Sequence, residues 1–129
     1  MCAAVDEALR THTTTLSAIA PSGDASDLEP LDGTVADAAV VGLGEATHGT
    51  RECFECKHRL VRYLVERHGF RTVAFEADVA AMHAANEYVR SGDGDPAAAL
   101  GELDMWQWQT DSVRDLLAWL RAFNDGRPP

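Results

Sequence analysis

The sequence predicts an α/β fold in which a βαβ unit with parallel strands is flanked by further helices. Residues 38–43 form a short apolar run that ends next to glycine, as a fully buried parallel strand does. Residues 50–68 then carry apolar side chains at helical spacing, and residues 71–76, RTVAFE, are predicted to form a second strand. Such short connections favour the right-handed crossover of two parallel strands.

The chain before the first predicted strand is expected to hold one helix and a loop. Apolar side chains recur at spacings of three and four over residues 5–19. The run Thr13-Thr14-Thr15 weakens this prediction, because β-branched side chains lose rotamer freedom in a helix. Residues 21–27 contain Pro, Gly, Ser and Asp and are predicted to be a loop.

Three more helices are predicted after the first half of the chain. Gly69 is placed to end the helix over residues 50–68, and a further helix is expected over residues 79–89. Asp95 is expected to cap a short helix over residues 96–103, which has proline at its first position. Residues 111–123 carry apolar side chains on one face and form the last predicted helix.

The predicted sheet has only two strands and is therefore unfinished. Two parallel strands expose bare edges and do not make a stable sheet by themselves. We therefore expect either an incomplete part of a larger α/β domain or a partner chain that completes the sheet.

The composition narrows the class of partner. The chain has 129 residues, room for one domain, and a net charge of −10. This charge argues against nucleic acid and anionic membranes, which are themselves negative. Lys57 is the only lysine among 11 basic residues. An acidic surface with almost no lysine is typical of a halophilic protein, and an ordinary acidic protein from a GC-rich genome is the alternative.

The sequence also indicates a cytoplasmic location. The first 20 residues lack the basic and apolar regions of a signal peptide, and no apolar run is long enough to span a bilayer. Three cysteines, an odd number, indicate reduced thiols. Cys53 and Cys56 form a C-x-x-C match, which we interpret as small apolar side chains rather than a redox or zinc site.

Two carboxylates and a histidine are predicted to meet at one edge of the sheet. Glu45 follows the first predicted strand, Glu76 ends the second, and His48 lies three residues after Glu45. Carboxylates around an imidazole raise its pKa and orient it, as a general base requires. The same three side chains could instead hold a divalent metal, or the two glutamates could simply cap the following helices.

The helix over residues 50–68 has a lysine and a histidine within its apolar face. A buried charge needs a partner, and the acidic edge formed by Glu45 and Glu76 is the obvious one for Lys57. For His58 we expect a hydrogen bond to a backbone carbonyl. Trp106 and Trp108 are expected to anchor a loop on the core, with an aromatic wall for an apolar ligand as the alternative.

The motif residues resemble a known family. The run VGLGEATHGTRE at residues 41–52 resembles the signature of the erythromycin esterase family. Residues 57–60, 69–77 and 94–96 resemble the segments that follow this signature, in the same order. The resemblance covers residues 28–124, so we assign residues 1–27 to an N-terminal helix and loop. Residues 28–129 are then the N-terminal part of an erythromycin esterase-like domain.

The resemblance implies a hydrolase with an α/β fold that opens a macrolactone-type carboxylic ester, as in macrolide antibiotic resistance. It implies that His48 activates water, that Glu45 and Glu76 line the site, and that Lys57 stands where some members have arginine. Lysine keeps the charge and loses the bidentate fork of arginine. Members of the family are longer than this chain. The alternative function is therefore a catalytically inactive remnant or a partner-binding module of the same fold.

Overall fold

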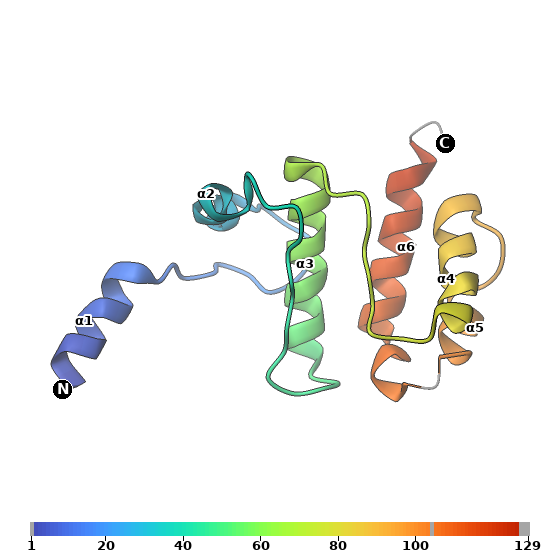
Figure 1. Cartoon of the computed structure of the whole chain (residues 1–129), viewed down its shortest axis with the longest axis horizontal. Helices are drawn as coiled ribbons and strands as arrows, with labels where there is room; N and C mark the ends of the chain where they lie inside the picture. Colours follow the sequence, from blue (N-terminus) through green and yellow to red (C-terminus); the bar gives the residue numbers. More distant parts are fainter. Residues whose placement is uncertain (1, 104, 127–129) are drawn as a thin grey trace.

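The computed structural model describes residues 2–103 and 105–126, and these residues fold into helices joined by long irregular connections. The α-helices are α1 (Cys2–His12), α2 (Asp32–Val35), α3 (Arg51–His68), α4 (Val79–Ser91), α5 (Pro96–Gly101) and α6 (Asp111–Asp125). Two 3-10 helices, η1 (Ser26–Leu31) and η2 (Trp106–Trp108), complete the order. In Figure 1, α3, α6 and α4 lie side by side, while α1 stands away from them.

The predicted parallel βαβ unit is wrong for the residues that the structure describes. Residues 38–43 and 71–76 have no regular secondary structure, and no β-ladder joins them. Some of their apolar side chains are partly buried against helices, while Val40 is 85% exposed. Leu43, Val73 and Phe75 pack against the cluster formed by α3 and α6. Without a neighbouring strand at hydrogen-bonding distance, a short apolar run has no ladder to join.

The predicted helices are largely confirmed, because their signals are local. Gly69 ends α3 in the left-handed conformation, with φ of +75°. The Asp95 side chain accepts a hydrogen bond from the Ala97 backbone N–H at 3.1 Å, with Pro96 at the first position of α5. The N-terminal helix is shorter than predicted and ends at His12, before the threonine run.

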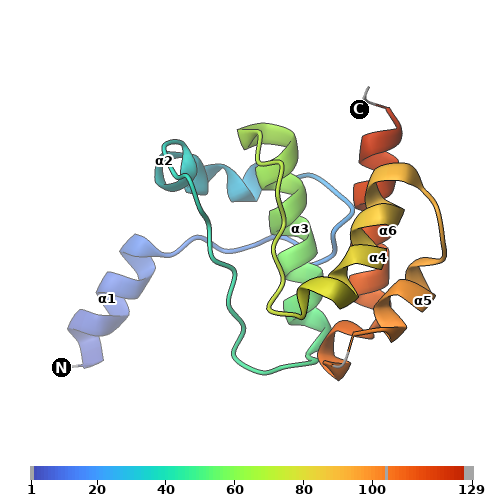
Figure 2. The same cartoon turned by 45° about the vertical axis from the view of Figure 1, so that its right-hand side comes forward.

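Two apolar clusters hold α3, α4, α5 and α6 together. The larger one includes Phe54 of α3, Ala85 of α4, Leu100 of α5 and Leu117 of α6. The smaller one joins Val61 and Val65 of α3 with Leu116 of α6, and partly buried side chains of residues 43, 73 and 75 cover it. Figure 2 shows the connection over residues 36–50 running back along α3 to the start of that helix. This return brings the motif turn beside the helix.

Candidate active site

The motif turn over residues 44–50 holds a histidine against a carboxylate. His48 Nδ1 lies 2.9 Å from Glu45 Oε1. The Glu45 side chain is only 8% exposed, whereas that of His48 is 61% exposed. A carboxylate beside Nδ1 favours the tautomer that carries its proton on Nδ1. The Nε2 atom of His48 then has a free lone pair for an incoming proton.

Lys57 reaches the same carboxylate from α3. Its Nζ forms an ion pair with Glu45 Oε2, the oxygen that His48 does not use. The Lys57 side chain is 16% exposed, and partial burial lowers its pKa because desolvation disfavours the charged form. Glu45 thus connects a half-buried cation on the helix with an exposed imidazole on the turn.

These side chains share one cavity of about 330 Å³ with Glu76. The cavity lies between the motif turn, α3, residues 73–76 and the start of α6. Its apolar lining includes Phe54, Phe75 and Trp108, and Ser112 adds a hydroxyl. All the predicted site residues therefore line one cavity whose lining combines charged and apolar side chains. The residues that line the cavity are Leu43, Gly44, Glu45, His48, Phe54, Lys57, Val61, Val73, Ala74, Phe75, Glu76, Trp108, Ser112, Val113 and Leu116.

Glu76 belongs to the cavity in a different way. Its backbone carbonyl accepts a hydrogen bond from Trp108 Nε1–H at 3.1 Å. Among the described residues, its carboxylate makes no ion pair or hydrogen bond with Glu45, His48 or Lys57. The structure therefore joins three of the predicted site residues directly and brings the fourth to the same cavity. Among the residues that the structure describes, no three His, Cys, Asp or Glu side chains form a group that could hold a metal ion.

Two neighbours of the site differ from their predictions. Trp108 is buried and lines the cavity, while Trp106 is 64% exposed and does not. His58 is buried, yet its Nε2 atom has no hydrogen-bond partner among residues 2–103 and 105–126, so the predicted bond to a backbone carbonyl is not found there. Burial lowers the pKa of His58 to about 4, and the nearby Arg62 guanidinium adds to this effect. Cys53 and Cys56 are half-buried free thiols.

The sequence patterns did not identify Ser112 or Arg59. Ser112 lies in the first turn of α6 and lines the cavity, and no local feature distinguishes it from other serines near helix starts. Arg59 is buried on α3 and binds Asp27. Its position two residues after Lys57 gave no indication of this role, because the partner is 32 residues away.

Comparison with known proteins decides the family. The erythromycin esterase family profile matches residues 65–129. Erythromycin esterase type II of Escherichia coli is 30% identical over 104 residues, which are 81% of this chain and 24% of that protein.

The chain belongs to the erythromycin esterase family.

Two solved structures have a similar fold over nearly the whole chain. A Bacillus cereus protein matches with a TM-score of 0.88 and 36% identity over 98% of this chain and 30% of its own length. A succinoglycan biosynthesis protein matches with a TM-score of 0.87 and 34% identity over 95% of this chain and 30% of its own. The chain thus spans about a quarter of the erythromycin esterase it matches. Within residues 2–103 and 105–126, no helix combines the length and the apolar character needed to cross a bilayer.

Proposed function

We propose that this chain carries the water-activating part of a hydrolase for macrolactone-type carboxylic esters. The observation that supports this proposal is the position of Glu45, which contacts His48 Nδ1 with one oxygen and Lys57 Nζ with the other. A histidine oriented by a carboxylate is the usual arrangement of a general base. The family relationship supports hydrolysis as the reaction class.

His48 would act through its Nε2 atom. The lone pair on Nε2 accepts a proton from water while the water oxygen bonds to the ester carbonyl carbon. The resulting tetrahedral intermediate collapses by breaking the ester C–O bond. The His48 imidazolium then returns its proton to the leaving alkoxide, so that acid and alcohol are released and the base is restored.

Lys57 and Glu45 would stabilise the charges that develop in this reaction, and Glu76 would act on the water. Glu45 stabilises the imidazolium that forms on His48, and Lys57 keeps Glu45 ionised and oriented. Lys57 also lines the cavity, where a cation stabilises the developing oxyanion better than in bulk water. Glu76, on the same cavity, would orient the attacking water.

The cavity favours an ester with apolar carbons next to the carbonyl. Phe54, Phe75 and Trp108 contribute aromatic rings to its lining, and Lys57 Nζ lies 5.5 Å from the centroid of the Phe54 ring. A cavity of about 330 Å³ receives the ester group and neighbouring carbons, so most of a large lactone ring would lie outside it. A macrolactone is therefore the proposed substrate, with smaller apolar esters as its analogues.

The test is hydrolysis of a macrolide and of a model phenyl ester by the wild type and by His48→Ala. We expect the substitution to lower kcat by about 100-fold or more, because the proton acceptor is lost. His12→Ala is the matched control, since His12 is exposed on α1 and distant in sequence from the site. Equal rates for His48→Ala and the wild type would remove His48 from the mechanism.

The metal alternative can be tested in the same assay. A direct base requires no bound ion, so hydrolysis should continue at the same rate after treatment with EDTA. Loss of activity in EDTA, with recovery on addition of one divalent metal, would instead indicate metal-bound water.

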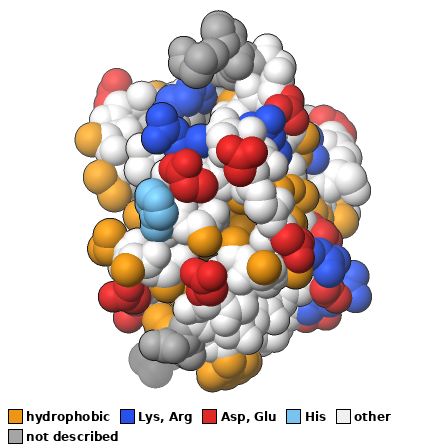
Figure 3. Space-filling model, turned by 90° about the vertical axis from the view of Figure 1, so that its right-hand side faces the viewer, with side chains coloured by type: hydrophobic (Ala, Val, Ile, Leu, Met, Phe, Trp, Pro, Cys, Tyr) orange, Lys and Arg blue, Asp and Glu red, His pale blue; other side chains and the backbone are white. Residues whose placement is uncertain are grey.

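A second function is favoured by a separate apolar groove. This groove has a volume of about 630 Å³ and lies between residues 71–77, α4 and α6. Its lining includes Met82, Val89, Leu117 and Leu120. Figure 3 shows hydrophobic side chains between charged ones on the side of the molecule where α4 and α5 lie. We propose as the alternative that this chain is inactive alone and binds a polypeptide equivalent to the rest of its longer relatives.

Mixing experiments separate the two functions. The probe is the part of the Bacillus cereus relative that lies outside the matched region, added as a separate polypeptide. A stable 1:1 complex that is weakened by Leu120→Asp, with hydrolysis only in the mixture, supports the partner-binding module. No complex by light scattering at micromolar concentrations contradicts it. Hydrolysis by the chain alone supports the first proposal.

A further inference from the structure

Trp106 lies against the backbone of the motif turn, next to His48. A β-carbon built on Gly49 would be 2.7 Å from Trp106 Cζ3 and 3.0 Å from Trp106 Cη2. Both distances are shorter than non-bonded carbon contacts allow, so the six-membered ring of the indole fills the space that a side chain would occupy. Gly49 also has a φ of +78°, which favours glycine. The absence of a side chain at Gly49 therefore permits the close approach of Trp106.

Few hydrogen bonds connect the turn with other segments that the structure describes. Residues 44–49 form no backbone–backbone hydrogen bonds with other described segments. Within the turn, the side chains of Thr47 and Thr50 bond to each other, and His48 bonds to Glu45. The ion pair from Lys57 holds Glu45, at the start of the turn. The Trp106 ring thus supports the end of the turn where His48 and Gly49 lie.

The segment that carries Trp106 is itself firmly anchored. Trp108, two residues later, donates its Nε1–H to the Glu76 carbonyl and packs edge-on against two phenylalanines. The ring centroids are 5.8 Å apart for Phe54 and 5.2 Å apart for Phe75. Gln107 is buried between the two tryptophans in sequence. The short helix η2 therefore connects the backbone at Glu76 with the backbone at Gly49.

We propose that Trp106 is a positioning residue that holds the His48 turn at a fixed place relative to Glu76. This role rests on the function proposed for His48, and Trp106 itself does not touch the reacting atoms. One indole of η2 is fixed at the segment that carries Glu76, and the other presses on the segment that carries His48. The three-residue helix η2, with Gln107 between the two tryptophans, would thereby set the distance between the segments that carry His48 and Glu76.

The first experiment measures His48 directly, without turnover. The imidazole signals of His48 are followed by NMR from pH 5 to 9 in the wild type, Trp106→Ala and Val40→Ala, with His48→Gln for assignment. We expect Trp106→Ala to shift or broaden the His48 titration and to speed amide exchange over residues 44–50. Val40→Ala is the control, because Val40 is an exposed apolar residue on the same connection. Identical His48 titrations in Trp106→Ala and the wild type would overturn the proposal.

Gly49→Ala tests the contact from the other side. In the wild-type background, the added methyl group displaces the indole, so this variant should reproduce the His48 changes of Trp106→Ala. In the Trp106→Ala background the same substitution retains only its backbone strain, and its further effect on the His48 titration should be small. Fully additive effects in this double-mutant cycle would show that the two residues are independent.

Kinetics distinguish a failure of this role from a failure of the proposed reaction. If the chain hydrolyses esters, Trp106→Ala should lower kcat with little change in KM, and its urea midpoint should stay close to that of the wild type because the indole is largely exposed. A response of His48 without any ester hydrolysis would leave the contact intact and reject only the reaction. Wild-type kcat in Trp106→Ala would reject the positioning role alone.

Discussion

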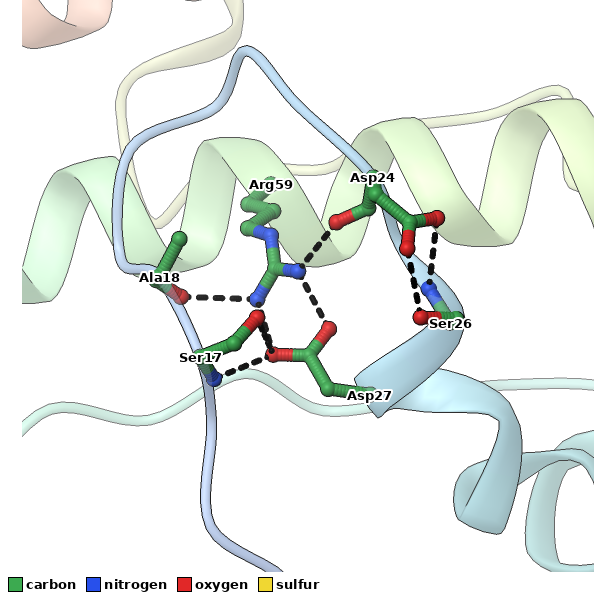
Figure 4. A network of polar contacts seen from close by, with 6 residues as sticks. All are labelled: Ser17, Ala18, Asp24, Ser26, Asp27 and Arg59. Atoms are coloured by element: carbon green, nitrogen blue, oxygen red, sulfur yellow. Dashed lines mark hydrogen bonds and ion pairs between the residues drawn. The ribbon is translucent and has the colours of Figure 1, made fainter.

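Lys57 and Arg59 lie two positions apart on α3, and each pairs with a carboxylate from the preceding half of the chain. The surroundings of the two ion pairs differ. Arg59 is 3% exposed and donates to the backbone carbonyls of Ala18 and Asp24 as well as to Asp27 (Figure 4). Lys57 pairs with Glu45 at the wall of a cavity.

The comparison distinguishes a structural anchor, the Arg59–Asp27 pair, from a candidate functional site, the Lys57–Glu45 pair. Asp27 also accepts hydrogen bonds from the Ser17 backbone N–H at 2.6 Å and the Ser17 hydroxyl at 2.9 Å, so both members of its pair have several partners. Because the polar groups of both side chains are hydrogen-bonded within the protein, the pair fixes the segment of residues 17–27 on α3 and leaves no group free for a ligand. The Glu45 pair instead ends at an exposed imidazole. Incomplete saturation beside a cavity is the pattern expected of a functional site.

The largest expected effect is on stability, from Arg59→Met. This change leaves Asp27 without its buried cation and removes donors from two backbone carbonyls. We expect the free energy of unfolding to fall by about 3 to 5 kcal/mol, measured by urea denaturation. The double variant with Asp27→Leu should recover part of this loss. A drop below about 1 kcal/mol for Arg59→Met would remove the distinction between the anchor and the site.

The next effect is a pH dependence caused by His58, which lies between the two cations on α3. Its pKa is about 4 in the folded chain, below the ordinary 6.5, because burial disfavours the charged form. Neutral His58 therefore makes its full contribution to the free energy of unfolding above pH 6.5, and this contribution is lost as the pH falls toward 4. With solvent screening, we expect a loss on the order of 2 kcal/mol at pH 4.

His58→Phe is the matched variant for that pH effect. Phenylalanine keeps an aromatic ring near Trp119, whose ring centroid is 6.0 Å from that of His58, and it removes the unpaired Nε2 atom. Urea unfolding measured between pH 7 and 4 should show a shallower decline for this variant than for the wild type. Parallel curves would mean that another group controls the acid response. Below that range, Asp27 adds its own decline, because Arg59 holds the Asp27 pKa under its usual value.

The smallest expected effect on stability comes from Lys57→Met. Lys57 is partly exposed at the cavity, so water can replace some of its contact with Glu45. We expect the free energy of unfolding to change by about 1 kcal/mol, while ester hydrolysis falls much more. Lys57→Arg should restore the charge and most of the activity. A stability loss as large as that of Arg59→Met would place Lys57 among the anchors.

The candidate site was more predictable than the fold around it. Glu45 and His48 are three residues apart on one short turn, and Lys57 lies in the second turn of α3, the helix that follows. Local spacing therefore nearly determines that these three side chains come into contact. Ser112 and Trp108 reach the cavity from distant segments, and no spacing rule connects them to the motif. The strand prediction was wrong because an apolar run does not show which segment it would pair with, and Val40 within the first run is 85% exposed.

The sequence by itself determined where most helices begin and end and which residues carry reactive groups. Capping residues such as Asp95, the glycine at position 69 and the 3.6-residue period act within a few neighbours, so they survive any tertiary context. Only the tertiary structure decided that Arg59 binds Asp27, that His58 Nε2 has no hydrogen-bond partner among the described residues, and that Trp106 rests on Gly49. These outcomes depend on packing between segments that are far apart in the chain, which local patterns do not encode.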